Sequence, residues 1–166
     1  IVDRELALTR SALTRVDIGR ALAHYSTVEK WHPGGSSADL YLSRELANQF
    51  RLSSDVRIKL QTWTPAFRAA AHAATTSEER QNAFYNLAIF FATQNDVANV
   101  ERSLRNAILW APNWFKPHWT LAKLYLTQQR LQEAESEARR AVELNGGKDR
   151  EVTQTLTDIR SAIAKR

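Results

Sequence analysis

An internal similarity at an offset of 34 residues constrains the fold of this chain more than any other feature. The aligned positions keep their apolar character: Leu87 with Leu121, Ala88 with Ala122, Phe91 with Tyr125, and Ala107 with Ala141. A fixed period of this length indicates stacked copies of one supersecondary unit, because each copy leaves an apolar face that its neighbour must bury. The chain is therefore expected to be an array of structural repeats.

Apolar residues recur three and four positions apart through almost the whole sequence, as amphipathic helices require. Capping and breaking residues separate these runs, with Ser53 or Ser54 expected as one N-cap and Glu78-Glu79 in the first turn of a later helix. The pattern predicts an all-α fold with nine helices: 3–15, 18–31, 37–51, 55–74, 78–94, 96–109, 114–127, 130–144 and 149–164.

Two consecutive segments resemble the tetratricopeptide repeat (TPR), a pair of antiparallel helices with large, small and aromatic residues at fixed positions. Residues 81–114 supply Phe84, Leu87, Ala88, Phe91, Val100, Leu104, Ala107 and Pro112. Residues 115–148 supply His118, Leu121, Ala122, Tyr125, Ala134, Ala138, Ala141 and Gly146. The first segment departs from the family pattern at Val100, and the second departs at His118 and Gly146.

The resemblance implies a right-handed superhelix of about four antiparallel helix pairs plus a C-terminal capping helix, forming one TPR domain over residues 1–166. Residues 1–35 fit as a divergent repeat, 36–76 as an irregular, extended helix pair, and 149–164 as the capping helix. Pro65 interrupts the apolar pattern of the irregular pair, and proline inside a helix either kinks it or restarts it. One long kinked helix is preferred to a restart at Thr64.

In TPR proteins, five positions of the first helix of each pair line a concave groove, so the resemblance also implies binding residues. The expected groove residues are Asn82, Tyr85, Ile89, Ala92 and Thr93 with Asn86 beside them, and then Lys116, Trp119, Lys123, Leu126 and Thr127. Tyr85 and Trp119 either anchor a ligand or pack against an adjacent repeat. The Lys and Asn set of the TPR carboxylate clamp is incomplete here.

The stretch W-A-P-N-W-F-K-P-H-W, residues 110–119, spans the joint between the two regular repeats. Trp110 and Phe115 are expected to be buried where the repeats meet. Trp119 is expected to face the groove, one helical turn before Lys123 on the same side. On this interpretation, truncating Trp110 lowers stability strongly, whereas truncating Trp119 lowers it little and weakens binding instead.

Catalytic and metal-binding patterns are missing from the sequence. The chain has no cysteine, its four histidines have no metal-ligand spacing, and its carboxylate clusters have the spacing of solvated helix faces. Gly34-Gly35 precedes a helix but lacks the lysine and the strand of a phosphate-binding loop. We therefore expect no catalytic residue, no metal and no cofactor, and predict that this chain is not an enzyme.

Charge also narrows the choice of partner. The formal net charge is +5, but the excess of cations is one in residues 1–52, one in 53–112 and three in 113–166. No basic tract results, which disfavours nucleic acid as a ligand. The leading hypothesis is a scaffold module that docks a protein or peptide in its groove. The alternative is a module that binds glycan or nucleic acid through groove Trp, Tyr and Lys side chains.

A second resemblance concerns the context of the chain. The stretches GGSSADLYLSRELA, NAFYNLAIFFATQND, ERSLRNAILWAPNWFKPHWTLAKL and EAESEARRAVEL resemble the soluble C-terminal TPR region of bacterial O-antigen ligase/polymerase-like membrane proteins. That likeness implies an extracytoplasmic, periplasmic fragment that works with glycan or lipid-linked glycan machinery. A cytoplasmic location is the alternative. The absence of methionine, including at the first position, also suggests a piece of a longer protein. Membrane attachment is then expected only through segments outside this sequence.

Overall fold

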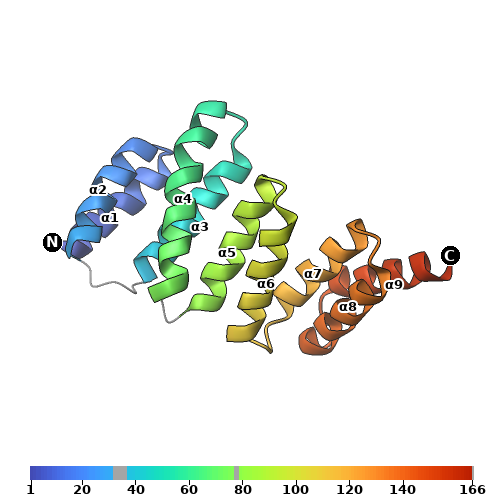
Figure 1. Cartoon of the computed structure of the whole chain (residues 1–166). Coiled ribbons are helices and arrows are strands. Elements are labelled where there is room, and N and C mark those ends of the chain that lie inside the picture. The colour runs from blue at the N-terminus through green and yellow to red at the C-terminus, as the bar shows by residue number, and fades with distance from the viewer. Residues whose placement is uncertain (32–36, 77–78, 166) are drawn as a thin grey trace. The chain divides into compact units, whose positions relative to one another are not determined.

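The computed structural model describes residues 1–31, 37–76 and 79–165, which form nine helices and no strand (Figure 1). In chain order they are α1 Val2–Thr14, α2 Ile18–Trp31, α3 Ser37–Leu52, α4 Val56–Thr76, α5 Arg80–Thr93, α6 Val97–Trp110, α7 Phe115–Thr127, α8 Leu131–Asn145 and α9 Arg150–Ala164. Every boundary lies within two residues of its predicted position. The all-α prediction is confirmed. The Gly34-Gly35 turn and Glu78 lie outside the described residues.

The chain divides into two compact units, which are treated separately below. Unit 1 comprises Ile1–Asp96 with helices α1 to α5, and unit 2 comprises Val97–Arg166 with helices α6 to α9. Among the helices described in both units, none is long and apolar enough to cross a membrane.

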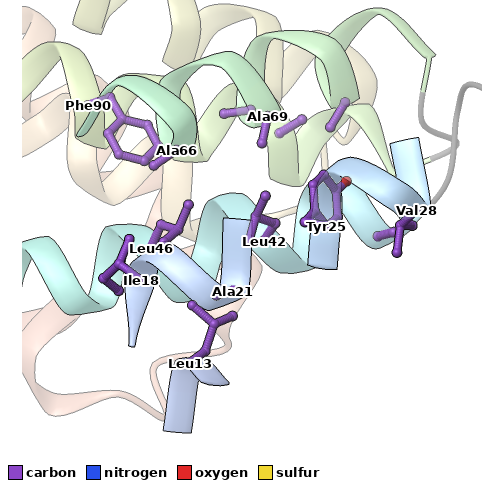
Figure 2. Packing of buried hydrophobic residues seen from close by; sticks show 14 of the residues in the cluster. Leu13, Ile18, Ala21, Tyr25, Val28, Leu42, Leu46, Ala66, Ala69 and Phe90 are labelled. Atoms are coloured by element: carbon purple, nitrogen blue, oxygen red, sulfur yellow. The ribbon is translucent and has the colours of Figure 1, made fainter. Parts of the chain in front are cut away.

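Unit 1 is built on two helix pairs, α1 with α2 and α3 with α4, and α5 packs against the second pair. Its core, shown in Figure 2, combines large side chains on α1, α2, α3 and α5 with small ones on α4. Ala66 and Ala70 are completely buried on α4. Figure 2 shows Ala66 and Ala69 facing the larger Leu42 and Leu46 of α3. Small residues on one helix let the partner approach closely, so this stripe of alanines sets the tight contact of the pair.

Helix α4 runs unbroken from Val56 to Thr76 with Pro65 inside it, so the preference for one long helix over a restart is confirmed. The expected cap, however, was wrong by one or two residues. Asp55 accepts a hydrogen bond from the Arg57 backbone N–H at 2.8 Å, and the Ser53 hydroxyl accepts one from the Asp55 N–H at 3.0 Å. Asp55 is the N-cap because it directly precedes the first helical residue. A carboxylate at this position also interacts favourably with the positive end of the helix dipole.

In unit 2, α7 packs on α8, α6 on α7, and α9 covers α8, as expected of a capping helix. Seven repeat positions of residues 115–148 are buried: His118, Leu121, Ala122, Tyr125, Ala134, Ala138 and Ala141. Gly146 ends α8 with a left-handed φ of 67°, a conformation that glycine adopts without a steric cost. Asp149 caps α9 by accepting from the Glu151 N–H at 2.9 Å.

The predicted burial of Trp110 is wrong, because 51% of this residue is exposed, and Phe115 is only half-buried. Trp110 is the last residue of α6, one turn beyond the buried Ala107. At that point the helix ends, and the repeat position does not place the indole in the core. The repeat pattern marked an apolar position correctly but overestimated how much of a tryptophan the helix end could cover.

Candidate binding surface

Three of the predicted groove residues of unit 1 line one hollow of about 370 Å³. Ile89, Ala92 and Thr93 contribute from α5, where their spacing of three and four places them on one face. The remaining wall comes from Phe90 and from two other helices: Ala47, Phe50 and Arg51 of α3, and Lys59 of α4. Residues from three helices of the unit therefore converge on a mainly apolar depression.

Aromatic packing on α4 holds one wall of this hollow. The Trp63 indole N–H donates to the Thr93 hydroxyl at 3.1 Å, and its ring stacks on Phe67 with centroids 5.3 Å apart. Phe67 in turn meets Phe91 edge to face at 5.4 Å. Since Thr93 also donates to the Phe90 carbonyl at 2.7 Å, its position is fixed by bonds on both sides. The hollow is thus preformed by a packed and hydrogen-bonded frame.

The charge on this surface is positive. Lys59 lies with its Nζ 5.6 Å from the centre of the Phe50 ring, and Arg51 is exposed beside it. Within residues 1–31, 37–76 and 79–165, neither cation is paired with a carboxylate, and no acidic residue lines the hollow. An apolar floor with an unpaired cationic rim suits a ligand that combines an apolar side chain with negative charge.

The other predicted residues of unit 1 do not line this hollow. Asn82 donates to the Glu79 carboxylate at 2.9 Å, and Asn86 donates to the Ser43 hydroxyl on α3 at 3.1 Å. Because Ser43 lies on α3, the bond from Asn86 ties α5 to α3, a structural role that the repeat pattern alone did not indicate. Tyr85 is half-buried.

In unit 2, the predicted neighbours Trp119 and Lys123 do lie together. The Lys123 Nζ is 3.7 Å from the centre of the Trp119 ring, and burial lowers the pKa of the Lys123 ammonium. The Trp119 N–H donates to the Thr155 hydroxyl of α9 at 2.8 Å, so this indole also joins α7 to the capping helix.

The other three predicted residues of unit 2 differ in exposure. Lys116 and Thr127 are exposed, and Leu126 is half-buried. The Thr127 hydroxyl donates to the Leu124 carbonyl at 2.7 Å, a local bond at the end of α7.

Histidines and carboxylates also pair between the two helices of a pair, a feature that their sequence spacing did not predict. His24 on α2 lies 2.7 Å from Glu5 on α1, and His118 on α7 lies 2.7 Å from Glu137 on α8. His72 on α4 lies 2.5 Å from the buried Asp39 on α3, which also accepts from the Tyr25 hydroxyl. These pairs link helices, and no group of three or more potential metal ligands occurs in the described part of the chain. His32 lies outside that part.

A second ionic cluster holds α6, α7 and α8 of unit 2 together. The Glu101 carboxylate accepts from Arg130 at 2.9 Å, from the Tyr125 hydroxyl at 2.8 Å and from Arg105 at 3.1 Å. These hydrogen bonds, led by that from Arg130, lower the pKa of Glu101 to about 2. Burial and the bond to Glu101 raise the pKa of Tyr125 to about 12. Both shifts keep Glu101 ionised and Tyr125 protonated at neutral pH, the states that form these hydrogen bonds. The cluster therefore has the properties expected of a structural contact between helices.

Comparison with known proteins identifies the fold. No family model matches the chain, and no curated protein matches it either. A TPR protein of Thermus thermophilus is similar in structure, with 19% identity, a TM-score of 0.69, and coverage of 96% of this chain and 81% of that one. MamA is similar at 13% identity and a TM-score of 0.74, covering 98% and 82% of the two chains.

The first TPR of Spaghetti (RPAP3), bound to an HSP90 peptide, is similar over 79% of this chain and 98% of that one, at 18% identity and a TM-score of 0.62. At sequence identities this low, structural similarity establishes the fold of this chain and does not assign its ligand. The chain has an all-α fold of the TPR type.

Proposed function

We propose that this chain is a non-catalytic protein-interaction module, and that the hollow lined by α3, α4 and α5 seats an apolar side chain of a protein or peptide partner. The observation that carries the proposal is the convergence of Ile89, Ala92 and Thr93 on that hollow. These residues were expected to bind from their repeat positions alone, and they lie on a preformed apolar surface with Phe50. Rigid apolar depressions of a few hundred Å³ are typical seats for a binding anchor.

The similar structures support the class of ligand. One of them is a TPR domain in complex with an HSP90 peptide. The side chains in unit 2 also bear on the alternative of a glycan or nucleic-acid platform. That alternative needs a free aromatic face, whereas one face of Trp119 is covered by Lys123 and its N–H is bonded to Thr155. We therefore favour a peptide ligand and place it on the hollow in unit 1.

The proposed context rests on sequence resemblance. We propose that residues 1–166 act as one TPR domain, the periplasmic C-terminal region of a bacterial O-antigen ligase/polymerase-like membrane protein. The partner would then belong to glycan or lipid-linked glycan machinery, with the chemistry performed by other parts of the parent. Sequencing the complete gene tests this context, because several hydrophobic segments preceding residue 1 are required. A gene that encodes none would refute it.

The binding role is tested by peptide selection followed by mutation of the hollow. Peptides selected on the immobilised 166-residue chain are measured by fluorescence anisotropy against the wild type, Ile89→Glu and Val97→Glu. The isoleucine and valine positions are matched, since both are helical and 36% and 39% exposed. A carboxylate in the hollow should weaken binding by roughly tenfold or more, as expected for a hot-spot position. Equal loss for both variants, or for neither, would overturn the assignment of the site.

A further inference from the structure

The corner between α3 and α4, residues 51–60, carries a concentration of exposed aliphatic side chains. Leu52 is 76% exposed, Val56 66% and Leu60 74%. Single apolar residues on a surface are common and need no explanation. Three highly exposed aliphatic residues within nine positions are an unusual local concentration, and concentrated apolar surface marks contact sites. Nothing in the core of unit 1 requires them to be apolar.

The length of α4 makes this corner project. Helix α4 has 21 residues, whereas α2 and α5 have 14 each. At 1.5 Å per residue, α4 is about 32 Å long and its neighbours are about 21 Å long. Figure 1 shows α4 reaching past α2 and α5 at the α3–α4 corner. Val56 and Leu60 are four residues apart on the same face of the projecting turn, and Leu52, the last residue of α3, precedes Val56 by four positions.

Cations surround these aliphatic side chains. The corner contains Arg51, Arg57 and Lys59 and one acid, Asp55. Asp55 is already engaged, because it accepts from the Arg57 backbone N–H and lies 3.3 Å from the Arg57 guanidinium. Among the described residues, Arg51 and Lys59 pair with no carboxylate. The corner thus presents three aliphatic side chains and two uncompensated positive charges.

We propose that the α3–α4 corner is a peripheral docking site for an anionic lipid surface. The aliphatic side chains of Leu52, Val56 and Leu60 would enter the boundary between headgroups and acyl chains. The two unpaired cations would lie among the lipid phosphates, as in interfacial segments that combine apolar and basic residues. This contact differs from a membrane span and does not depend on the hollow binding a peptide.

Two other occupants fit the corner less well. A second copy of the chain would bring two sets of unpaired cations together, and like charges at an interface oppose association. A peptide would have a nearby hollow of about 270 Å³ in which to bind, lined in part by Phe50, Val56, Leu60 and Trp63. Leu52 lines neither this hollow nor the larger one, so a peptide in either would leave the most exposed of the three aliphatic residues in water. A lipid surface does not require a concave seat, so all three aliphatic residues can contribute to the contact.

The test is co-sedimentation of the 166-residue chain with vesicles. Vesicles of phosphatidylcholine mixed with phosphatidylglycerol are compared with vesicles of phosphatidylcholine alone. The chain should bind the anionic vesicles, bind the neutral ones much less, and dissociate as salt is raised, because exposed charges are screened over about 8 Å at physiological salt. The double variant Leu52→Ser, Leu60→Ser should lose roughly tenfold in partitioning, because two buried aliphatic contacts are removed.

Leu109→Ser is the matched control, since Leu109 is also a helical leucine and is 75% exposed. It should bind anionic vesicles like the wild type, and circular dichroism should show all variants folded. Equal binding by the double variant and the wild type would overturn the proposal, as would no binding to anionic vesicles. If vesicles do not bind but a Glu-Leu hexapeptide shifts the amide NMR signals of residues 51–60, the occupant is an acidic peptide. A dimer in sedimentation equilibrium that the double variant abolishes would instead identify a second copy.

Discussion

Replacing Trp119 by alanine tests whether this residue mainly stabilises unit 2. The sequence suggested a small cost for Trp119 and a large one for Trp110, and the structure reverses that order. Trp119 is half-buried, donates to Thr155 on α9 at 2.8 Å and lies under the Lys123 ammonium. Trp110 is 51% exposed at the end of α6. We expect Trp119→Ala to be the more destabilising of the two.

The magnitude follows from three contacts of Trp119. Truncation of a fully buried aromatic residue costs about 3–5 kcal/mol, so a half-buried one should cost about 2 kcal/mol. The lost hydrogen bond to Thr155 adds about 1 kcal/mol, and the lost contact with Lys123 adds about 0.5 kcal/mol. Because neighbouring contributions are not additive, we expect about 3 kcal/mol in total. Trp110→Ala should cost about 1–2 kcal/mol, since half of its surface already meets water.

Urea unfolding followed by far-UV circular dichroism measures both variants without relying on tryptophan fluorescence. A double-mutant cycle with Thr155→Val isolates the hydrogen bond, and its coupling free energy should be about 0.5–1.5 kcal/mol. A smaller loss for Trp119→Ala than for Trp110→Ala would refute the reasoning. A coupling free energy of zero between Trp119 and Thr155 would also refute it, because the hydrogen bond to α9 would then contribute nothing to stability.

Three further predictions concern the packing and the ionic joints. Ala122→Leu should lower the free energy of unfolding in urea by about 1–3 kcal/mol, because Ala122 is completely buried in α7 and has no room for a larger side chain. The pKa of Glu101 is lowered to about 2, so its stabilising contribution is complete above its ordinary pKa and is lost as pH falls through about 2. Glu101→Gln should therefore lose stability at neutral pH and show a flatter acid unfolding curve. Asp39→Asn should destabilise by about 2–3 kcal/mol in thermal unfolding, because the buried carboxylate accepts from Tyr25 and lies against His72. Unchanged stability on Asp39→Asn substitution would show that neither contact matters.

The regular repeats were predictable because each of their positions has one packing role. In residues 115–148, a small residue is needed wherever two helices touch, and a large one wherever a gap must be filled. Ala122 and Ala138 are completely buried, and Tyr125 is buried beside them, as the pattern required. The pattern fails at helix ends, where side chains have fewer neighbours. Trp110 is exposed for this reason.

The candidate site was only half predictable. Ile89, Ala92 and Thr93 follow from the repeat register, which fixes one face of α5. Their partners on the other two helices do not, because Phe50 and Lys59 belong to the irregular pair, where no family position could be assigned. Hydrogen bonds between distant residues were equally hidden. The bond from Asn86 to Ser43 joins positions 43 residues apart, and no periodicity relates them.

The extra length of α4, which makes the second helix pair irregular, also creates the proposed binding surfaces. A helix of the length of α5 that ended, like α4, at Thr76 would begin near Trp63 and would contain neither Val56 nor Lys59. The additional turns of α4 supply the cation beside Phe50 and two of the three exposed aliphatic residues of the α3–α4 corner, Val56 and Leu60. Alanines such as Ala66 and Ala70 hold the second half of α4 in the core, so that its first turns can extend beyond its neighbours without losing the fold. A shortened α4 should therefore lose Val56 and Leu60 from the corner and Lys59 from the rim of the hollow, which ties both proposed contacts to one departure from the repeat.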